Sequence, residues 1–135
     1  MSLYDFSEET LDWLGEWMSQ TGNDRHEMTD SLTQGVENEL LTYMREYGDR
    51  DNYSLYRGID YLVDGNVVVI NTLSSWSLSV DMAYNFGPNI VHIEAHKEDV
   101  LIDTSLFIPE EVTGLLGGFP DEQEVILFPG EYALL

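Results

Sequence analysis

The chain has 135 residues, enough to fold as one domain around a hydrophobic core. It has no cysteine, which excludes disulfides and thiolate zinc sites. Its 26 acidic residues outnumber 5 basic ones, and the net charge of -21 disfavours direct binding to nucleic acid or an anionic membrane. No apolar run is long enough to span a bilayer and no basic segment precedes one, so we expect a cytoplasmic protein.

The first 48 residues predict two helices. Residues 7–19 start at a capping serine and carry apolar residues at helical spacing. Trp13 and Trp17 lie one turn apart on this helix, and we interpret them as packing residues rather than as a platform for a ligand. A polar break at residues 21–24 precedes a second amphipathic helix over residues 30–47, which Gly48 ends.

From residue 53 the chain consists of short apolar runs separated by turn residues, which is typical of strands. The runs predict strands at residues 53–59, 66–73, 90–95 and 100–106, a short helix at 80–86 capped by Ser79, a glycine-rich loop, and a last strand that stops at Pro129-Gly130. Helices followed by strands indicate an α+β fold with two small, packed, mainly antiparallel sheets. We expect a single domain over residues 1–135, with a helical part at 1–48 and a β-rich part at 53–135.

Two carboxylates, Glu122 and Glu124, stand where a Gly/Pro-rich loop enters the last strand. Because side chains on a strand repeat every two residues, we expect both carboxylates to point to the same face. At the lip of a cleft, two adjacent acids can take separate catalytic tasks. The alternative is an edge strand protected by charges.

Arg57 lies inside an apolar strand and is followed by Gly58. Arginine is seldom buried without a partner, so one interpretation is a structural ion pair. The other is an anion clamp, because a guanidinium holds a phosphate in a fork, with Gly58 allowing a ligand close to the backbone. The hydroxyl-rich segment 72–79 is either a turn with a helix cap or a source of a positioning hydroxyl.

Two further sequence patterns give little indication of a functional site. His92, Glu94 and His96 alternate along one strand face, and we favour exposed strand residues over a metal site, so no metal is predicted. Gly114, Gly117 and Gly118 lack the Lys-Ser/Thr of a phosphate-binding loop.

Taken in order, three of these segments resemble the arginine-serine-glutamate signature of ADP-ribosyltransferases. They are an aromatic-Arg-Gly strand, a Ser-x-Ser strand end and a Glu-x-Glu pair: Tyr56-Arg57-Gly58, Ser75-Trp76-Ser77 and Glu122-Gln123-Glu124. The resemblance covers residues from about 53 onward and is closest to small bacterial and bacteriophage members that modify host proteins. It implies an NAD cleft, with residues 53–135 as the catalytic core.

The resemblance also implies a role for each residue. Arg57 would bind the NAD phosphates, and Ser75 would position Arg57 and the catalytic acid. Glu124 would bond the nicotinamide ribose and stabilise an oxocarbenium-like transition state, while Glu122 would serve transfer to an arginine acceptor. The other expected NAD contacts are Gly58, Trp76, Ser77 and Phe86, with Tyr84 as an alternative to Phe86 for stacking on the nicotinamide, and Phe119 would recognise the target. Trp76 stands where threonine is commoner in the family, which implies a reshaped nicotinamide pocket.

The resemblance therefore implies a mono-ADP-ribosyltransferase that uses NAD as co-substrate. Since the chain is strongly acidic, we expect a basic acceptor protein, of the kind that handles nucleic acid. Plain hydrolysis of NAD, with water as the acceptor, is another possible reaction. The rival interpretation is a non-enzymatic DNA mimic, of the antirestriction or anti-CRISPR type, that blocks a basic groove.

Overall fold

The computed structural model describes residues 2–19 and 25–135. Its helices are α1 (Glu8–Ser19), α2 (Arg25–Asp30), α3 (Gln34–Tyr47), α4 (Val80–Ala83) and α5 (Pro109–Leu116). Its strands are β1 (Asn52–Ile59), β2 (Val67–Ile70), β3 (Ser74–Ser77), β4 (Asn89–His96), β5 (Val100–Asp103), β6 (Glu124–Leu127) and β7 (Gly130–Leu134). The α+β class and the helices-first order are as the sequence predicts.

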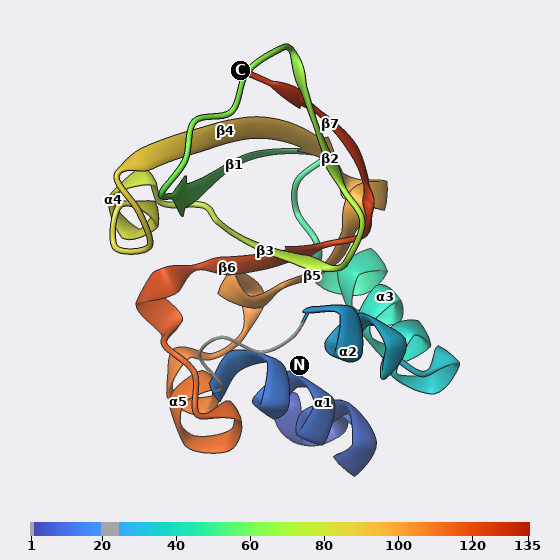
Figure 1. Cartoon of the computed structure of the whole chain (residues 1–135). Coiled ribbons are helices and arrows are strands. Elements are labelled where there is room, and N and C mark those ends of the chain that lie inside the picture. Colours follow the sequence, from blue (N-terminus) through green and yellow to red (C-terminus); the bar gives the residue numbers. More distant parts are fainter. Residues whose placement is uncertain (1, 20–24) are drawn as a thin grey trace.

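The strands form one sheet in the order β2-β7-β4-β1-β3-β6-β5, and every pairing is antiparallel. The prediction of two separate sheets is wrong in this respect. β1 pairs with β4 along all eight of its residues but meets β3 only at Tyr56 and Ser77. The sheet curls at this junction, so its two halves turn toward each other (Figure 1).

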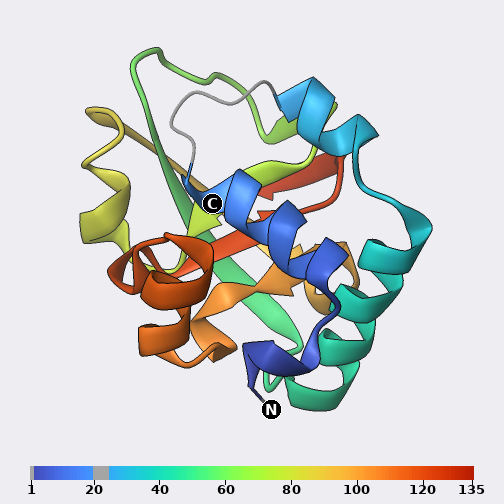
Figure 2. The ribbon, with the colours of Figure 1, turned by 90° about the horizontal axis from the view of Figure 1, so that it is seen from below.

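Three helices, α1, α3 and α5, cover the β3-β6-β5 half on the side away from β1 and β4 (Figures 1 and 2). Their buried side chains, among them Leu14 and Leu40, join a core that includes Leu101 and Ile126. All four residues of β6 are buried, as its run of strand formers predicts.

The helical part differs from the prediction for residues 30–47. Thr33 caps α3 by accepting a hydrogen bond from the Val36 N–H at 3.3 Å, so this helix begins at Gln34. The residues before it form the separate helix α2. Gly48 ends α3 as predicted. The predicted polar break at residues 21–24 lies outside the described residues.

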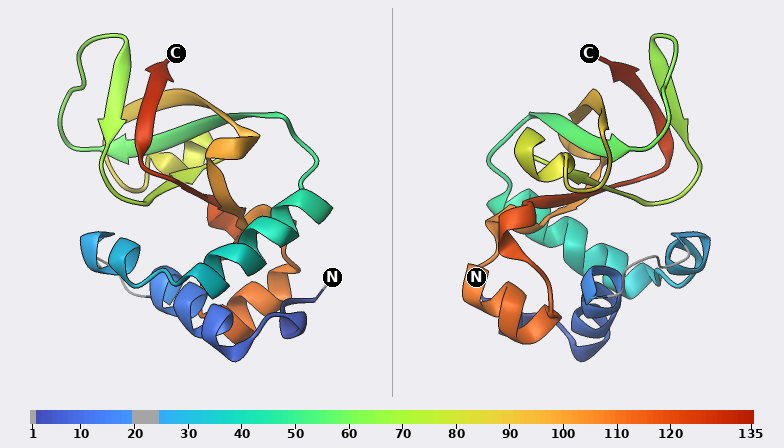
Figure 3. Two further views of the ribbon diagram at one scale, coloured as in Figure 1. Left: turned by 90° about the vertical axis from the view of Figure 1, so that its right-hand side faces the viewer. Right: turned by 60° about the vertical axis from the view of Figure 1, so that its left-hand side comes forward.

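The β-rich part departs from the prediction in five places. The predicted strand 100–106 ends at Asp103, and a 3-10 turn, Thr104–Leu106, follows it. The predicted strand 66–73 ends at Ile70, and the hydroxyl-rich segment after it forms β3. Ser79 caps α4 as predicted, although this helix ends at Ala83. The predicted glycine-rich loop contains α5, whose signals are a proline at its start and Gly117 at φ 66° after its end. The chain also continues beyond Pro129 as β7, which pairs with β2 at the end of the sheet (Figure 3).

Within the described residues, we find no helix with the length and apolar character that crossing a membrane requires.

Candidate active site

A cavity of about 200 Å³ opens between the two halves of the sheet, and six elements contribute to its wall: α2, β1, β3, α4, the 3-10 turn Pro120–Glu122 and β6. The predicted site residues that line it are Arg57, Gly58, Ser75, Trp76, Ser77, Phe86, Glu122 and Glu124. Arg25, which the sequence analysis did not select, lines it as well. Residues that are far apart in the chain therefore meet at one hollow.

Glu124 is the buried carboxylate of this cavity, with 6% of its surface exposed. It is the first residue of β6 and lies opposite Ser77 of β3. Its Oε2 accepts a hydrogen bond from the Ser75 hydroxyl and a second from the indole N–H of Trp17 at 2.8 Å. Thr104 Oγ1 fixes its backbone by donating to the Glu124 carbonyl at 2.6 Å. Because burying a carboxylate without hydrogen-bond donors is costly, these contacts fix the position of the Glu124 carboxylate.

Glu122 reaches the same cavity by a different route from the one predicted. It belongs to a 3-10 turn, Pro120–Glu122, and not to the strand. The residue between the two acids, Gln123, takes a left-handed φ of 46°, so the two-residue strand period does not relate them. The Ser77 hydroxyl donates to the Glu122 carbonyl at 2.7 Å and holds this turn. Burial, together with the nearby charge of Glu124, raises the pKa of Glu122.

Arg57 presents its guanidinium to the cavity from β1. The apolar strand around it predicts a buried side chain, but Arg57 is exposed. Its guanidinium carbon lies 5.9 Å from the centre of the Trp76 ring. Among the residues that the structure describes, no carboxylate forms an ion pair with it. The structural ion pair considered from the sequence is therefore not found there, and the guanidinium is available to an anion.

Gly58 is required by the packing of the protein itself. A Cβ atom at this position would lie 1.9 Å from the backbone oxygen of Ala83, at the end of α4. The space expected for a ligand is thus occupied by α4, although Gly58 still lines the cavity.

Arg25, at the start of α2, is the second cation of the cavity. Its guanidinium carbon lies 3.8 Å from the centre of the Trp17 ring. Its Nη1 is buried and has no hydrogen-bond partner among the described residues. Burial lowers the pKa of Arg25, and the Arg57 charge lowers it further, while Glu124 opposes both. No motif surrounds Arg25 in the sequence; its only signal is that the chain has just 5 basic residues.

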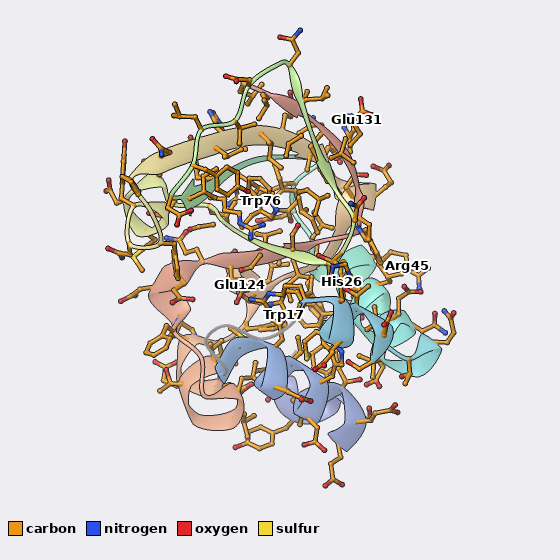
Figure 4. The ribbon with its side chains drawn as sticks, viewed as in Figure 1. Trp17, His26, Arg45, Trp76, Glu124 and Glu131 are labelled. Atoms are coloured by element: carbon orange, nitrogen blue, oxygen red, sulfur yellow. The ribbon has the colours of Figure 1, made fainter. Side chains whose placement is uncertain are left out.

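Trp17 packs as predicted, since it is 1% exposed and stacks on Trp13 with ring centres 5.5 Å apart. Its second contact has no signal in the sequence. Figure 4 shows Trp17 on α1 directly below Glu124, to which it donates the hydrogen bond described above. The two residues are 107 positions apart, so no local pattern could have predicted this pair.

A second cavity, of about 290 Å³, adjoins the first and shares Arg57 and Trp76 with it. Its other walls include Ile59 at the end of β1, Tyr61 after it, and the strand β2. Arg57 therefore lies between two hollows, and among the described residues only the first of the two is lined by carboxylates.

Of the two predicted aromatic contacts, Phe86 and Phe119, only Phe86 belongs to the first cavity. Phe86 lines the cavity and is 60% exposed. Phe119 caps the turn that carries Glu122 but is 64% exposed and does not line the cavity. Tyr84, also considered for stacking, is exposed outside the lining.

The alternating residues of β4 are engaged locally. His92 stacks on Tyr56 and lies 2.5 Å from the Ser54 hydroxyl, while His96 lies 2.8 Å from the Asn52 amide oxygen. In the described part of the chain, no three histidine, cysteine or acidic side chains gather as a metal site would require.

No protein-family model matches the sequence, and no curated protein matches it. The fold is ADP-ribosyltransferase-like. It is similar to that of exoenzyme S from Pseudomonas aeruginosa, in complex with human 14-3-3 protein beta and bound to Carba-NAD. The TM-score is 0.55, the identity is 15%, and the match covers 93% of this chain and 64% of the other. At this identity the likeness shows the fold alone, and the chain spans slightly less than two thirds of its neighbour.

Proposed function

We propose that this protein is a mono-ADP-ribosyltransferase that moves ADP-ribose from NAD to an arginine of another protein. The observation that carries the proposal is the convergence of Arg57, Ser75 and Glu124 on one cavity. They come from three separate strands, and Ser75 donates directly to the Glu124 carboxylate. The similarity of the fold to that of a protein bound to Carba-NAD supports the same reaction class.

The two adjoining cavities suit the two halves of a dinucleotide. The nicotinamide and its ribose would enter the first cavity, beside Glu124, and the adenosine would occupy the second, beside Tyr61 and Ile59. The pyrophosphate between them would meet Arg57, which belongs to both cavities, and Arg25, which lines the first. Guanidinium groups bind phosphate oxygens through paired N–H donors, so two of them suit a pyrophosphate.

In the proposed reaction, the bond from the ribose C1′ to nicotinamide breaks, and nicotinamide leaves with the bonding electrons. The ribose then carries positive charge, which the fixed Glu124 carboxylate stabilises, as carboxylates do in glycoside hydrolysis. A guanidinium nitrogen of the acceptor bonds to C1′. Because a protonated guanidinium cannot attack, Glu122 takes a proton from it as this bond forms.

The acceptor in this proposal is a basic protein. The chain carries a net charge of -21, which attracts basic surfaces such as those that hold nucleic acid. Phe119 stands exposed beside the turn of Glu122, where it can contact the acceptor. We place such nucleic-acid-handling host proteins first among candidate acceptors.

The proposal is tested by incubating the protein with labelled NAD and a host lysate, followed by mass spectrometry of the labelled proteins. Native protein should label arginines, and the Glu124→Gln variant should not. Glu122→Ala should reduce transfer to arginine much more than hydrolysis of NAD. A protein that neither transfers ADP-ribose nor gains thermal stability from NAD would instead fit the non-enzymatic DNA mimic.

A further inference from the structure

We infer that Trp17 is a positioning residue for the catalytic carboxylate, so that the helical part of the chain takes part in catalysis. The inference rests on the proposed function, in which Glu124 stabilises the developing ribose cation. It concerns the hydrogen bond from the Trp17 indole to Glu124, which crosses from α1 to β6.

The bond joins two groups that are both buried. Trp17 is 1% exposed and Glu124 is 6% exposed. The indole N–H and the Ser75 hydroxyl both reach Oε2, and this leaves the other carboxylate oxygen outside the pair of bonds. Two donors from different directions on one oxygen fix the rotation of a carboxylate, and thereby the direction in which its second oxygen points.

Trp17 also contacts Arg25, the second cation of the cavity. Arg25 stacks on the face of the indole at 3.8 Å, while the edge of the same ring donates to Glu124. Although both charges line one cavity, Arg25 and Glu124 do not form an ion pair. An ion pair would engage the carboxylate and the guanidinium with each other. The indole binds both without neutralising either, so Glu124 remains available to the ribose and Arg25 to an anion.

The test compares two tryptophan-to-phenylalanine variants of the full chain. Trp17→Phe removes the N–H but keeps an aromatic ring between Arg25 and Trp13. Trp13→Phe is the matched control, because Trp13 is also buried, belongs to the same stack, and donates its N–H to Ser31 at 3.1 Å instead. Both variants lose the same volume and one indole N–H, which in Trp13 also donates to the Met28 carbonyl at 3.4 Å.

The expected result is a kcat for nicotinamide release about tenfold or more lower for Trp17→Phe than for Trp13→Phe, because a hydrogen bond to a charged group is lost. The KM for NAD should be equal in the two variants, and a Tm measurement should show both to be folded at the assay temperature. In a Glu124→Gln background, Trp17→Phe should lower the residual rate no further than Trp13→Phe does, since the carboxylate that Trp17 positions is gone.

Equal kcat values for the two variants, in a native protein that does turn over NAD, would overturn the positioning role and leave the proposed function intact. An equal loss from Trp17→Phe with and without the Glu124 carboxylate would also overturn it. A native protein with no NAD turnover would overturn both proposals.

Discussion

Replacing Arg25 by glutamine tests whether the second guanidinium of the cavity binds NAD. The Nη1 of Arg25 has no hydrogen-bond partner among the described residues, so a ligand oxygen would gain a bond without displacing one. A hydrogen bond to a charged group contributes about 1.5–3 kcal/mol. Its loss corresponds to NAD binding that is about 10- to 150-fold weaker in Arg25→Gln.

The same change should have little effect on folding. Losing the contact of the guanidinium with Trp17 costs about 0.5–2 kcal/mol. Removing a buried nitrogen that has no hydrogen-bond partner among the described residues stabilises the fold by about 1–3 kcal/mol. The two effects are of similar size and opposite sign, so the Tm in the absence of NAD should stay close to that of the native protein.

The assay is calorimetric titration of the full chain with NAD, and Arg45→Gln is the control. Arg45 is exposed on α3, donates a hydrogen bond to Thr42 at 3.0 Å, and lies away from the cavity (Figure 4). Both substitutions remove one positive charge, so any general effect of net charge on an anionic ligand is the same. If Arg25→Gln binds NAD as tightly as Arg45→Gln does, Arg25 is not a phosphate ligand.

Three further predictions follow from the charges and the packing. Burial and the charge of Glu124 raise the pKa of Glu122, so ionisation of Glu122 destabilises the fold as the pH rises above 4.5, the ordinary pKa of a glutamate. Glu122→Gln should therefore have a higher Tm than the native protein at pH 7. A difference in Tm that is just as large at pH 3 would contradict this cause. Gly58→Ala should lower the free energy of unfolding by about 1–3 kcal/mol, because the added Cβ would clash with the Ala83 backbone. Gly114→Ala is the control and should not lower it, since a Cβ there meets no atom within 4 Å. Equal denaturation midpoints for the two variants would refute the packing argument. Raising salt from low concentration to about 0.15 M should strengthen NAD binding by screening the net charge of -21, and a steady weakening over this range would count against net repulsion.

Local patterns predicted the elements whose signals lie within a few residues. The apolar spacing of α1, the Ser79 cap and the run of strand formers in β6 all appear as expected. Local patterns were less reliable where the boundary of a strand depends on its pairing with another strand. β7 was missed because a short segment after Pro-Gly has no strand character of its own, and it becomes a strand by pairing with β2.

The residue types of the candidate site and their order along the chain could be read from the sequence, because a resemblance between motifs needs no coordinates. Arg57, Ser75 and Glu124 were chosen in this way. Distances among them could not be obtained, since they depend on how the sheet curls where β1 meets β3. The backbone turn at Gln123, which brings Glu122 into the cavity, likewise has no signature in the neighbouring residues.

The tertiary structure alone revealed the contribution of the helical part. Trp17 has the spacing of a packing residue, and Arg25 follows a stretch without any motif. Their contacts with Glu124 and the cavity arise because the helices pack against the β3-β6-β5 half of the sheet. Composition and periodicity are properties of neighbouring residues, whereas a hydrogen bond across 107 positions depends on the packing of the whole chain.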